Sequence, residues 1–114
     1  MAIRRLERRP EFLAVASSGL KAAMPGLVLQ VRPRGDDQPL RVGFTASRKV
    51  GGAVERNRAR RRLKAAAEQV LGREGRAGHD YVLIARAETV RRPFGLLLED
   101  LGRALGRIER GAGR

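Results

Sequence analysis

Hydrophobic and polar residues alternate most regularly between residues 40 and 47, which indicates a half-buried strand. Its apolar face would carry Leu40, Val42, Phe44 and Ala46. Its other face would carry small or polar side chains, namely Arg41, Gly43, Thr45 and Ser47. A mainly apolar stretch over residues 27–31 predicts a second strand. The segment between the two, PRGDDQP, is rich in turn-forming residues, so the pattern predicts a hairpin.

Apolar residues at helical spacing predict three helices. The first begins near Pro10 and ends at Gly19, because proline suits the first turn and glycine suits the stop. The second follows Gly51 and Gly52, runs to about Leu71, and has an apolar stripe made of Ala59, Leu63, Ala66, Ala67 and Val70. The third opens at Pro93, and its stripe consists of Phe94, Leu97, Leu98, Leu101, Leu105 and Ile108.

The segments between these elements complete the expected domain. The continuous apolar run over residues 80–86 predicts a strand at the centre of the sheet. Pro25 and Gly26 indicate that residues 20–26 form a loop. The glycine-rich residues 111–114 are expected to be frayed. A chain of 114 residues with 42% hydrophobic content suits one compact domain, which we assign to residues 1–114.

The charge changes this picture, because a formal net charge of +13 opposes folding through self-repulsion. Such a charge is typical of a protein that binds a polyanion. Nucleic acid is the first candidate and an anionic membrane surface the second. The chain lacks cysteine, which excludes disulfides, cysteine-ligated zinc and thiol catalysis. The sequence contains neither a secretory signal pattern nor an apolar run of membrane-spanning length.

The positive charge is concentrated between Ser47 and Lys64, where eight Lys or Arg residues accompany a single acid, Glu55. An ordinary exposed helix would alternate acids with these cations, because pairs four residues apart stabilise it. Arginine also predominates here, and its planar guanidinium group binds phosphate with two hydrogen bonds. The segment therefore predicts a helix that binds an anion, such as the phosphates of a nucleic acid, rather than an ordinary solvated face.

The acidic residues do not form a recognisable catalytic or metal-binding pattern. A metal-dependent nuclease needs clustered carboxylates, whereas Asp36 and Asp37 lie in a turn and Glu99 and Asp100 face different sides of a helix. The only histidine, His79, lies in a loop, and we interpret it as structural or incidental. Catalysis by the protein's own side chains is therefore not expected.

Phe12 has two interpretations. Its place on the first helix suits a core residue, but the neighbouring sheet face with Thr45 and Ser47 is polar, and an aromatic ring there would stack on a base. Three functions also remain open from the residues alone. They are a subunit of an RNA-processing enzyme, a structural RNA-binding protein such as a ribosomal protein, and a standalone nuclease.

The segment LRVGFTASRKVGGAVERNRARRRLK, residues 40–64, resembles the signature region of the bacterial ribonuclease P protein component. It combines a Val-Gly strand, a small polar pair, two cations, a glycine turn and an Arg-Asn-Arg run on a helix. RLERRPEFLAVASSG resembles the first helix of that family and DYVLIAR its later central strand. The resemblance covers nearly the whole chain.

The resemblance implies an α+β fold in a single domain, with a small, mainly antiparallel sheet and the order α-β-β-β-α-β-α. It also implies a left-handed βαβ crossover, against the usual rule. The implied function is that of the protein subunit of ribonuclease P. This subunit binds the catalytic RNA subunit and the 5′ leader of precursor tRNA, and the RNA subunit removes the leader with Mg²⁺. The metal would be held mainly by the RNA.

The resemblance also assigns the site residues. The basic helix would bind RNA through Arg56, Asn57, Arg58, Arg60, Arg61 and Lys64, and the loop before it through Arg48 and Lys49. The leader cleft would be lined by Phe12, Gln30, Thr45 and Ser47. Ala16 and Gln30 replace aromatic residues of some family members, which reduces stacking in this cleft. We expect no catalytic or metal-ligating residue in the protein, no membrane, no obligate protein partner and a cytoplasmic location.

Overall fold

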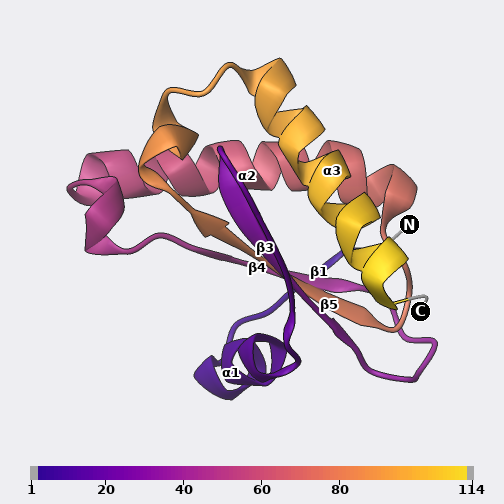
Figure 1. The fold of residues 1–114 in the computed structure, drawn as a ribbon. Coiled ribbons are helices and arrows are strands. Elements are labelled where there is room, and N and C mark those ends of the chain that lie inside the picture. The colour runs from indigo at the N-terminus through magenta and orange to yellow at the C-terminus, as the bar shows by residue number, and fades with distance from the viewer. Residues whose placement is uncertain (1–2, 113–114) are drawn as a thin grey trace.

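The computed structural model describes residues 3–112 and contains a five-stranded sheet with three helices (Figure 1). Two short 3-10 turns, Arg48–Val50 and Ala87–Val90, flank the longest helix and the last strand. In chain order the elements are β1 (Arg4–Arg5), α1 (Arg9–Ser17), β2 (Leu20–Met24), β3 (Leu27–Pro33), β4 (Arg41–Thr45), α2 (Ala53–Glu74), β5 (His79–Ala85) and α3 (Phe94–Ala112). Apart from the short β1, this is the order that the family resemblance implies.

The sheet has the strand order β1-β4-β5-β3-β2, so the predicted central strand, β5, is indeed central. The pairings of β2 with β3 and of β3 with β5 are antiparallel, and β3 with β5 is the longest in the sheet. The other two, β4 with β5 and β1 with β4, are parallel. The sheet is therefore mixed, and α2 forms the crossover between the parallel strands β4 and β5. The left-handed sense of that crossover stays a prediction.

Two predictions about the strands were wrong. Residues 20–26 are not a loop, because Leu20–Met24 form strand β2, which turns at Pro25–Gly26 and pairs with β3. The hairpin predicted across PRGDDQP is also wrong, since β3 and β4 are separated by β5. The turn-forming segment instead carries the chain from one side of β5 to the other.

Residues 111 and 112 belong to α3 rather than to a frayed end, and residues 113–114 lie outside the described residues.

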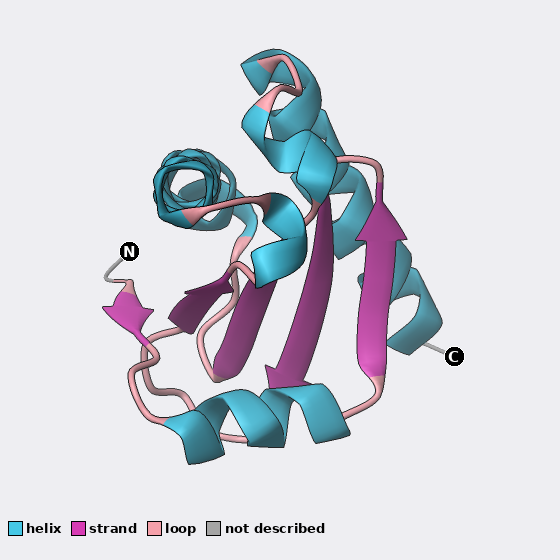
Figure 2. Cartoon of the chain, turned by 90° about the vertical axis from the view of Figure 1, so that its left-hand side faces the viewer, coloured by secondary structure: helices cyan, strands magenta, loops and turns pink. Residues whose placement is uncertain are grey.

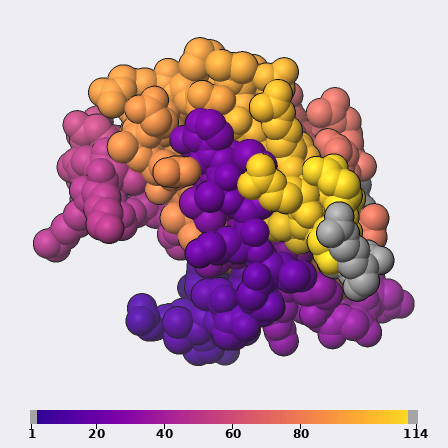
Figure 3. Space-filling view, viewed as in Figure 1, coloured from indigo at the N-terminus to yellow at the C-terminus, as the bar shows by residue number. Residues whose placement is uncertain are grey.

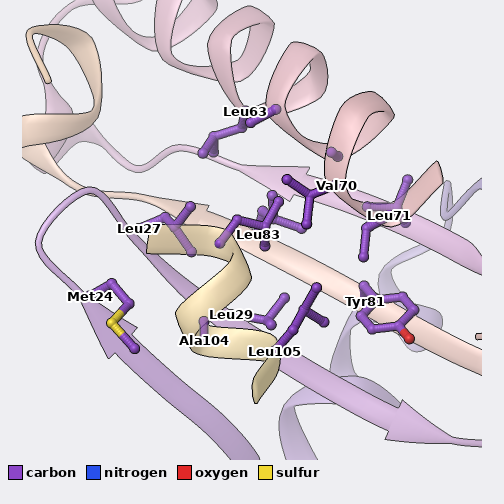
Figure 4. Close-up of a cluster of buried hydrophobic side chains, with 14 of the residues drawn as sticks. Met24, Leu27, Leu29, Leu63, Val70, Leu71, Tyr81, Leu83, Ala104 and Leu105 are labelled. Atoms are coloured by element: carbon purple, nitrogen blue, oxygen red, sulfur yellow. The ribbon is translucent and has the colours of Figure 1, made fainter. Parts of the chain in front are cut away.

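The main core lies between the sheet and the two long helices, α2 and α3 (Figures 2 and 4). The predicted stripe of α2 is confirmed, because all five of its residues are buried. Leu97, Leu101, Leu105 and Ile108 of α3 are buried as well. The apolar face of β4 packs on the same core. The basic helix is thus anchored along one side, which leaves its other side to solvent.

Helix α1 lies on the opposite face of the sheet (Figures 1 and 2). There Leu6, Val15 and Val82 form a second, smaller cluster, and the ring of Phe12 packs over Gly43 of β4. A Cβ atom at position 43 would overlap this ring. The glycine therefore lets α1 approach the sheet closely. Because α1 is short, it covers only part of this face.

A buried carboxylate fixes the turn-forming segment against the sheet. Asp80 of β5 is fully buried. It accepts hydrogen bonds from Arg34 at 2.5 Å and from Arg41 at 2.8 Å, with Arg32 at 3.4 Å. Burial would raise the pKa of Asp80, but the hydrogen bonds from Arg41 and Arg34 outweigh it and hold that pKa below its usual range. Arg34 also donates to the carbonyl oxygens of Gln38 and Pro39, so one guanidinium group organises the whole connection.

A second buried carboxylate joins α3 to the β2–β3 turn. Asp100 accepts hydrogen bonds from the backbone N–H of Gly26 at 3.0 Å and from Arg92 at 2.5 Å. A Cβ atom at position 26 would stand 2.6 Å from the Asp100 carboxylate, so only glycine fits this turn.

Among the described residues, no helix combines the length and the hydropathy that a bilayer span requires.

We predict that Asp80→Asn lowers the free energy of unfolding at pH 7 by about 3 kcal/mol, because it leaves Arg34 and Arg41 without their buried counter-charge. The pKa of Asp80 is lowered in the folded state, so its stabilisation is present at neutral pH and is lost as the pH falls below about 4. The gap between wild type and variant should therefore narrow in acid. Urea unfolding across this pH range measures it.

The exposed neighbour Asp37 offers a matched control, since it makes no ion pair with any described residue. Asp37→Asn should change stability by less than about 0.5 kcal/mol. Equal stability of Asp80→Asn and wild type at pH 7 would contradict the account.

Candidate nucleic-acid interface

The cations of α2 on its solvent side do not pair with any acid among the described residues. All seven ion pairs within residues 3–112 use Arg32, Arg34, Arg41, Arg76 or Arg92, none of which lies on α2. We define the basic face of α2 as the six predicted RNA-binding residues, Arg56, Asn57, Arg58, Arg60, Arg61 and Lys64. Arg56 and Arg60 are half-buried and the other four are exposed. The structure thus brings all six onto one helix, and the charges of the five cations among them are not neutralised by the described acids.

Two of these arginines are held in place by neighbouring polar atoms. Arg60 donates to the side-chain oxygen of Asn57 at 2.5 Å, one turn earlier on α2. Arg56 donates to the carbonyl oxygen of Gly51 at 3.1 Å. Neither contact neutralises the guanidinium charge, since both acceptors are uncharged. These contacts orient the side chains and so reduce the conformational entropy lost when a phosphate binds.

Arg62 differs from its neighbours, because it serves the fold. Its guanidinium group donates to the carbonyl oxygen of Thr89 at 2.9 Å and to that of Arg92, and it lies 6.0 Å from the ring centroid of Phe94. It therefore ties α2 to the segment that leads into α3. The sequence run Arg60-Arg61-Arg62 gives no sign of this difference until helical phase is considered.

The loop before α2 carries the two predicted cations at one end of the sheet. Ser47 caps the 3-10 turn by accepting a hydrogen bond from the backbone N–H of Lys49 at 3.3 Å. Gly51 follows with φ of 146°, a conformation that favours glycine. Arg48 and Lys49 are both exposed. The loop thus places two cations beside the N-terminus of α2, where the helix dipole also favours an anion.

The sheet face that α1 leaves uncovered forms a second candidate surface, which we call the open face. The strand register places Thr45 of β4 beside Ile84 of β5, and Ile84 beside Val28 of β3. The next row places Gly43, with Phe12 above it, beside Val82, and Val82 beside Gln30. The predicted residues Phe12, Gln30 and Thr45 therefore share one face, and all three are half-buried.

The open face continues into a hollow of about 640 Å³ at the end of the sheet. Figure 3 shows the molecule indented here, between α1 at the lower left and the segment before α2 at the left. Ser47, the fourth predicted cleft residue, lines this hollow rather than the strand rows, together with Lys49, Ile84 and Arg86. The sequence pattern did not identify Arg86 as a lining residue, although its position directly after β5 places it at this end of the sheet. Arg86 donates to the carbonyl oxygen of Met24 at 2.8 Å.

The structure shows that Phe12 packs against the core, whereas its stacking on a base stays a prediction. One side of the ring packs against Gly43 and the cluster of Leu6, Val15 and Val82. Its half-buried state leaves the rest of the ring accessible from the open face. Core packing thus fixes the position of a ring that is only half-buried.

Comparison with known proteins now adds to this geometry. The sequence matches the family model of ribonuclease P over residues 2–109. The chain belongs to the ribonuclease P protein family. It is 54% identical over 108 residues to the ribonuclease P protein component of Paramagnetospirillum magneticum, covering 91% of this chain and 81% of that one. It is 52% identical over 101 residues to that of Gluconacetobacter diazotrophicus, covering 89% and 87%.

Solved structures agree with this assignment. The ribonuclease P protein from Thermotoga maritima superposes with a TM-score of 0.75 at 30% identity, covering 91% of this chain and 96% of that one. The Staphylococcus aureus ribonuclease P protein, at 21% identity, gives a TM-score of 0.71 and supports the fold alone. Of the three functions that the residues left open, family membership selects the subunit of an RNA-processing enzyme. The chain is the protein component of an endoribonuclease whose catalysis is carried by RNA.

The remaining polar residues considered from the sequence are the carboxylates and the single histidine, His79. Within residues 3–112 no three His, Asp or Glu side chains converge as metal ligands. A ring nitrogen of His79 lies 2.9 Å from the carbonyl oxygen of Ala77, and its ring stacks on Tyr81 with 6.2 Å between centroids. These are structural contacts at the entrance of β5, as the sequence interpretation proposed.

We predict that alanine substitutions at two adjacent arginines of α2 affect stability unequally. Arg61→Ala should change the free energy of unfolding by less than about 0.5 kcal/mol, because Arg61 is exposed and makes no ion pair with the described residues. Arg62→Ala should lower it by about 1–3 kcal/mol, because it leaves the carbonyl groups of Thr89 and Arg92 without a donor. Thermal unfolding of the two variants provides the measurement, and equal effects would show that the structural role of Arg62 is wrong.

Proposed function

We propose that the two surfaces divide the work of this ribonuclease P protein. The basic face of α2 and the loop cations Arg48 and Lys49 bind the catalytic RNA subunit. The open face and its hollow bind the 5′ leader of precursor tRNA. In this way the protein assists the Mg²⁺-dependent removal of the leader, which yields the mature 5′ end of the tRNA.

The observation that carries this proposal is the placement of the surfaces on opposite sides of one sheet. Helix α2 packs on the face that holds the main core, whereas the open face is on the side of α1. The loop that ends with Gly52 links them, with Ser47 and Lys49 in the hollow and Arg48 beside them. One small domain is therefore able to contact two RNA chains at once.

The open face suits a single strand better than a duplex. Its floor is apolar at Val28 and Ile84, and it is bordered by the ring of Phe12 and by the polar groups of Gln30 and Thr45. Unpaired bases stack on such rings and expose their Watson–Crick edges for hydrogen bonding, whereas in a duplex these faces and edges are already occupied. Lys49 and Arg86 at the hollow supply positive charge for the backbone of the same strand.

The role of Mg²⁺ follows from the charge of the protein. The two RNAs repel each other, and both the metal ions and the protein's cations reduce that repulsion. Mg²⁺ binds mainly to the RNA partner in this proposal, because the described residues bring together no set of carboxylates for it. The protein thus lowers the concentration of Mg²⁺ that the assembled enzyme needs. The cytoplasm is the compartment that this function requires in a bacterium.

We predict that Phe12→Leu weakens binding of leader-bearing precursor tRNA by the reconstituted holoenzyme about tenfold and leaves binding of mature tRNA unchanged. Leucine keeps the packing over Gly43 but removes the ring, and stacking on one base contributes roughly 1–3 kcal/mol. The measurement is the dissociation constant for mature tRNA divided by that for precursor tRNA, which Phe12→Leu should lower. Ca²⁺ replaces Mg²⁺ to suppress cleavage.

Leu96→Ala provides the control, because Leu96 is an exposed apolar residue of α3, outside the leader surface. It should leave the ratio as in wild type. A ratio unaffected by Phe12→Leu, or lowered equally by both variants, would refute the assignment of the leader to the open face.

A further inference from the structure

A hollow that no sequence pattern predicted lies between the edge strand β1 and the basic face of α2. Its volume is about 350 Å³, and its lining residues are Arg5, Phe44, Asn57, Arg60, Arg61 and Lys64. A smaller hollow of about 190 Å³ adjoins it, since Arg5, Phe44 and Lys64 line both. We call the two together the β1–α2 hollow. Its combined size falls in the range of sites for small organic groups, about 300–1,000 Å³.

The hollow is apolar at its floor and cationic at its mouth. The floor residues Val42 and Ala67 are almost fully buried, and the ring of Phe44 beside them is half-buried. Arg5, Arg61 and Lys64 are exposed, and Arg60 is half-buried. The one acid of the lining, Glu68, belongs to the smaller hollow. An apolar floor below several cations matches a ligand that joins a flat apolar group to a phosphate.

Arg5 is held where it can stack on such a group. Its guanidinium carbon lies 5.0 Å from the centroid of the Phe44 ring, and it makes no ion pair with any described acid. A guanidinium group resting on a ring presents a flat, charged surface, and bases stack on both kinds of plane. Phe44 thus orients Arg5 in advance of binding, which reduces the entropy cost of the contact.

We propose that the β1–α2 hollow accepts one unpaired nucleotide of the RNA subunit. Its base stacks on the Phe44–Arg5 pair, and its phosphate contacts Arg60, Arg61 and Lys64. A paired base cannot enter, because its faces are covered by its neighbours in the helix. The inference rests on the proposed function, which assigns the basic face of α2 to the RNA subunit. It adds that this surface selects a nucleotide, whereas phosphate contacts alone would be indifferent to base pairing.

The RNA subunit is favoured over the leader by position. The open face and the β1–α2 hollow lie on opposite faces of the sheet, because Gly43 faces α1 while Phe44, the next residue of β4, faces α2. A leader bound along the open face would have to pass around the edge strand β1 to reach this hollow. The basic face of α2, in contrast, forms one wall of it.

Two variants separate stacking from charge. Arg5→Lys keeps the charge and removes the planar group, and Phe44→Leu removes the ring while keeping an apolar residue. Arg4→Lys is the matched control, because Arg4 is the exposed neighbour in β1 and does not line the hollow. The measurement is the dissociation constant of each full-length protein for a bacterial ribonuclease P RNA across a series of salt concentrations. Thermal unfolding verifies that each variant is folded.

We expect Arg5→Lys and Phe44→Leu each to weaken binding of the RNA subunit about tenfold, the effect of losing one stacked base. The slope of log affinity against log salt should stay the same, since no phosphate contact is lost. Arg4→Lys should bind like wild type. In the reconstituted holoenzyme, ultraviolet cross-linking should join the peptide that contains Phe44 to an unpaired nucleotide of the RNA subunit.

Other outcomes overturn the inference. Wild-type affinity of Arg5→Lys would show that charge alone acts at this position. A cross-link to a paired nucleotide or to the leader would show a different occupant. Failure of the proposed function has a distinct signature, because Arg61→Ala and Lys64→Ala would then also leave the affinity for the RNA subunit unchanged.

Discussion

The structure depends on how a few acids are distributed among many arginines. With a formal net charge of +13, the chain folds by placing two carboxylates, Asp80 and Asp100, in its interior. Asp80 binds three arginines and Asp100 binds one, all from outside α2, and each carboxylate fixes a connection between elements. The acids that form ion pairs are therefore committed to the fold, and the basic face of α2 keeps its charge. The repulsion among its cations is offset by the buried stripe that anchors the helix on the sheet.

This distribution gives the small sheet two different surfaces, to which we assign RNA binding. Because α2 and α3 cover one face and the short α1 covers part of the other, the domain offers a cationic surface and an uncovered strip of strands. The arginine run of α2 serves both the fold and the cationic surface. Arg62 joins α2 to the segment before α3, while the neighbouring arginines face solvent. Membership in the ribonuclease P protein family gives this arrangement its context, in which the cutting is left to RNA.

Local pattern predicted the parts of the fold that local pattern determines. The stripe of α2, the alternation in β4 and the central position of β5 were all evident, because burial imposes a period on the sequence. The β3–β4 hairpin failed, since the turn chemistry of residues 34–39 does not reveal that Arg34 ties that segment to Asp80 of a later strand. Strand β2 was missed because its alternation, Leu20 to Met24, includes two alanines and a lysine, and pairing with β3 overrides their weak preference. The place of Arg5 over Phe44 was equally beyond prediction, because it arises from the pairing of β1 with β4.

The central claim, that the α2 cations are unpaired in the protein and are neutralised only by RNA, is tested most directly by unfolding at increasing salt. The melting temperature of the protein alone is compared with that of its complex with a ribonuclease P RNA, from low to high NaCl. Screening should raise the melting temperature of the protein alone, because it weakens repulsion among unpaired cations. It should remove the additional stability that the RNA provides, because phosphate contacts are lost. A melting temperature of the protein alone that falls as salt is added would contradict the account, since it would show that these cations already have partners within the chain.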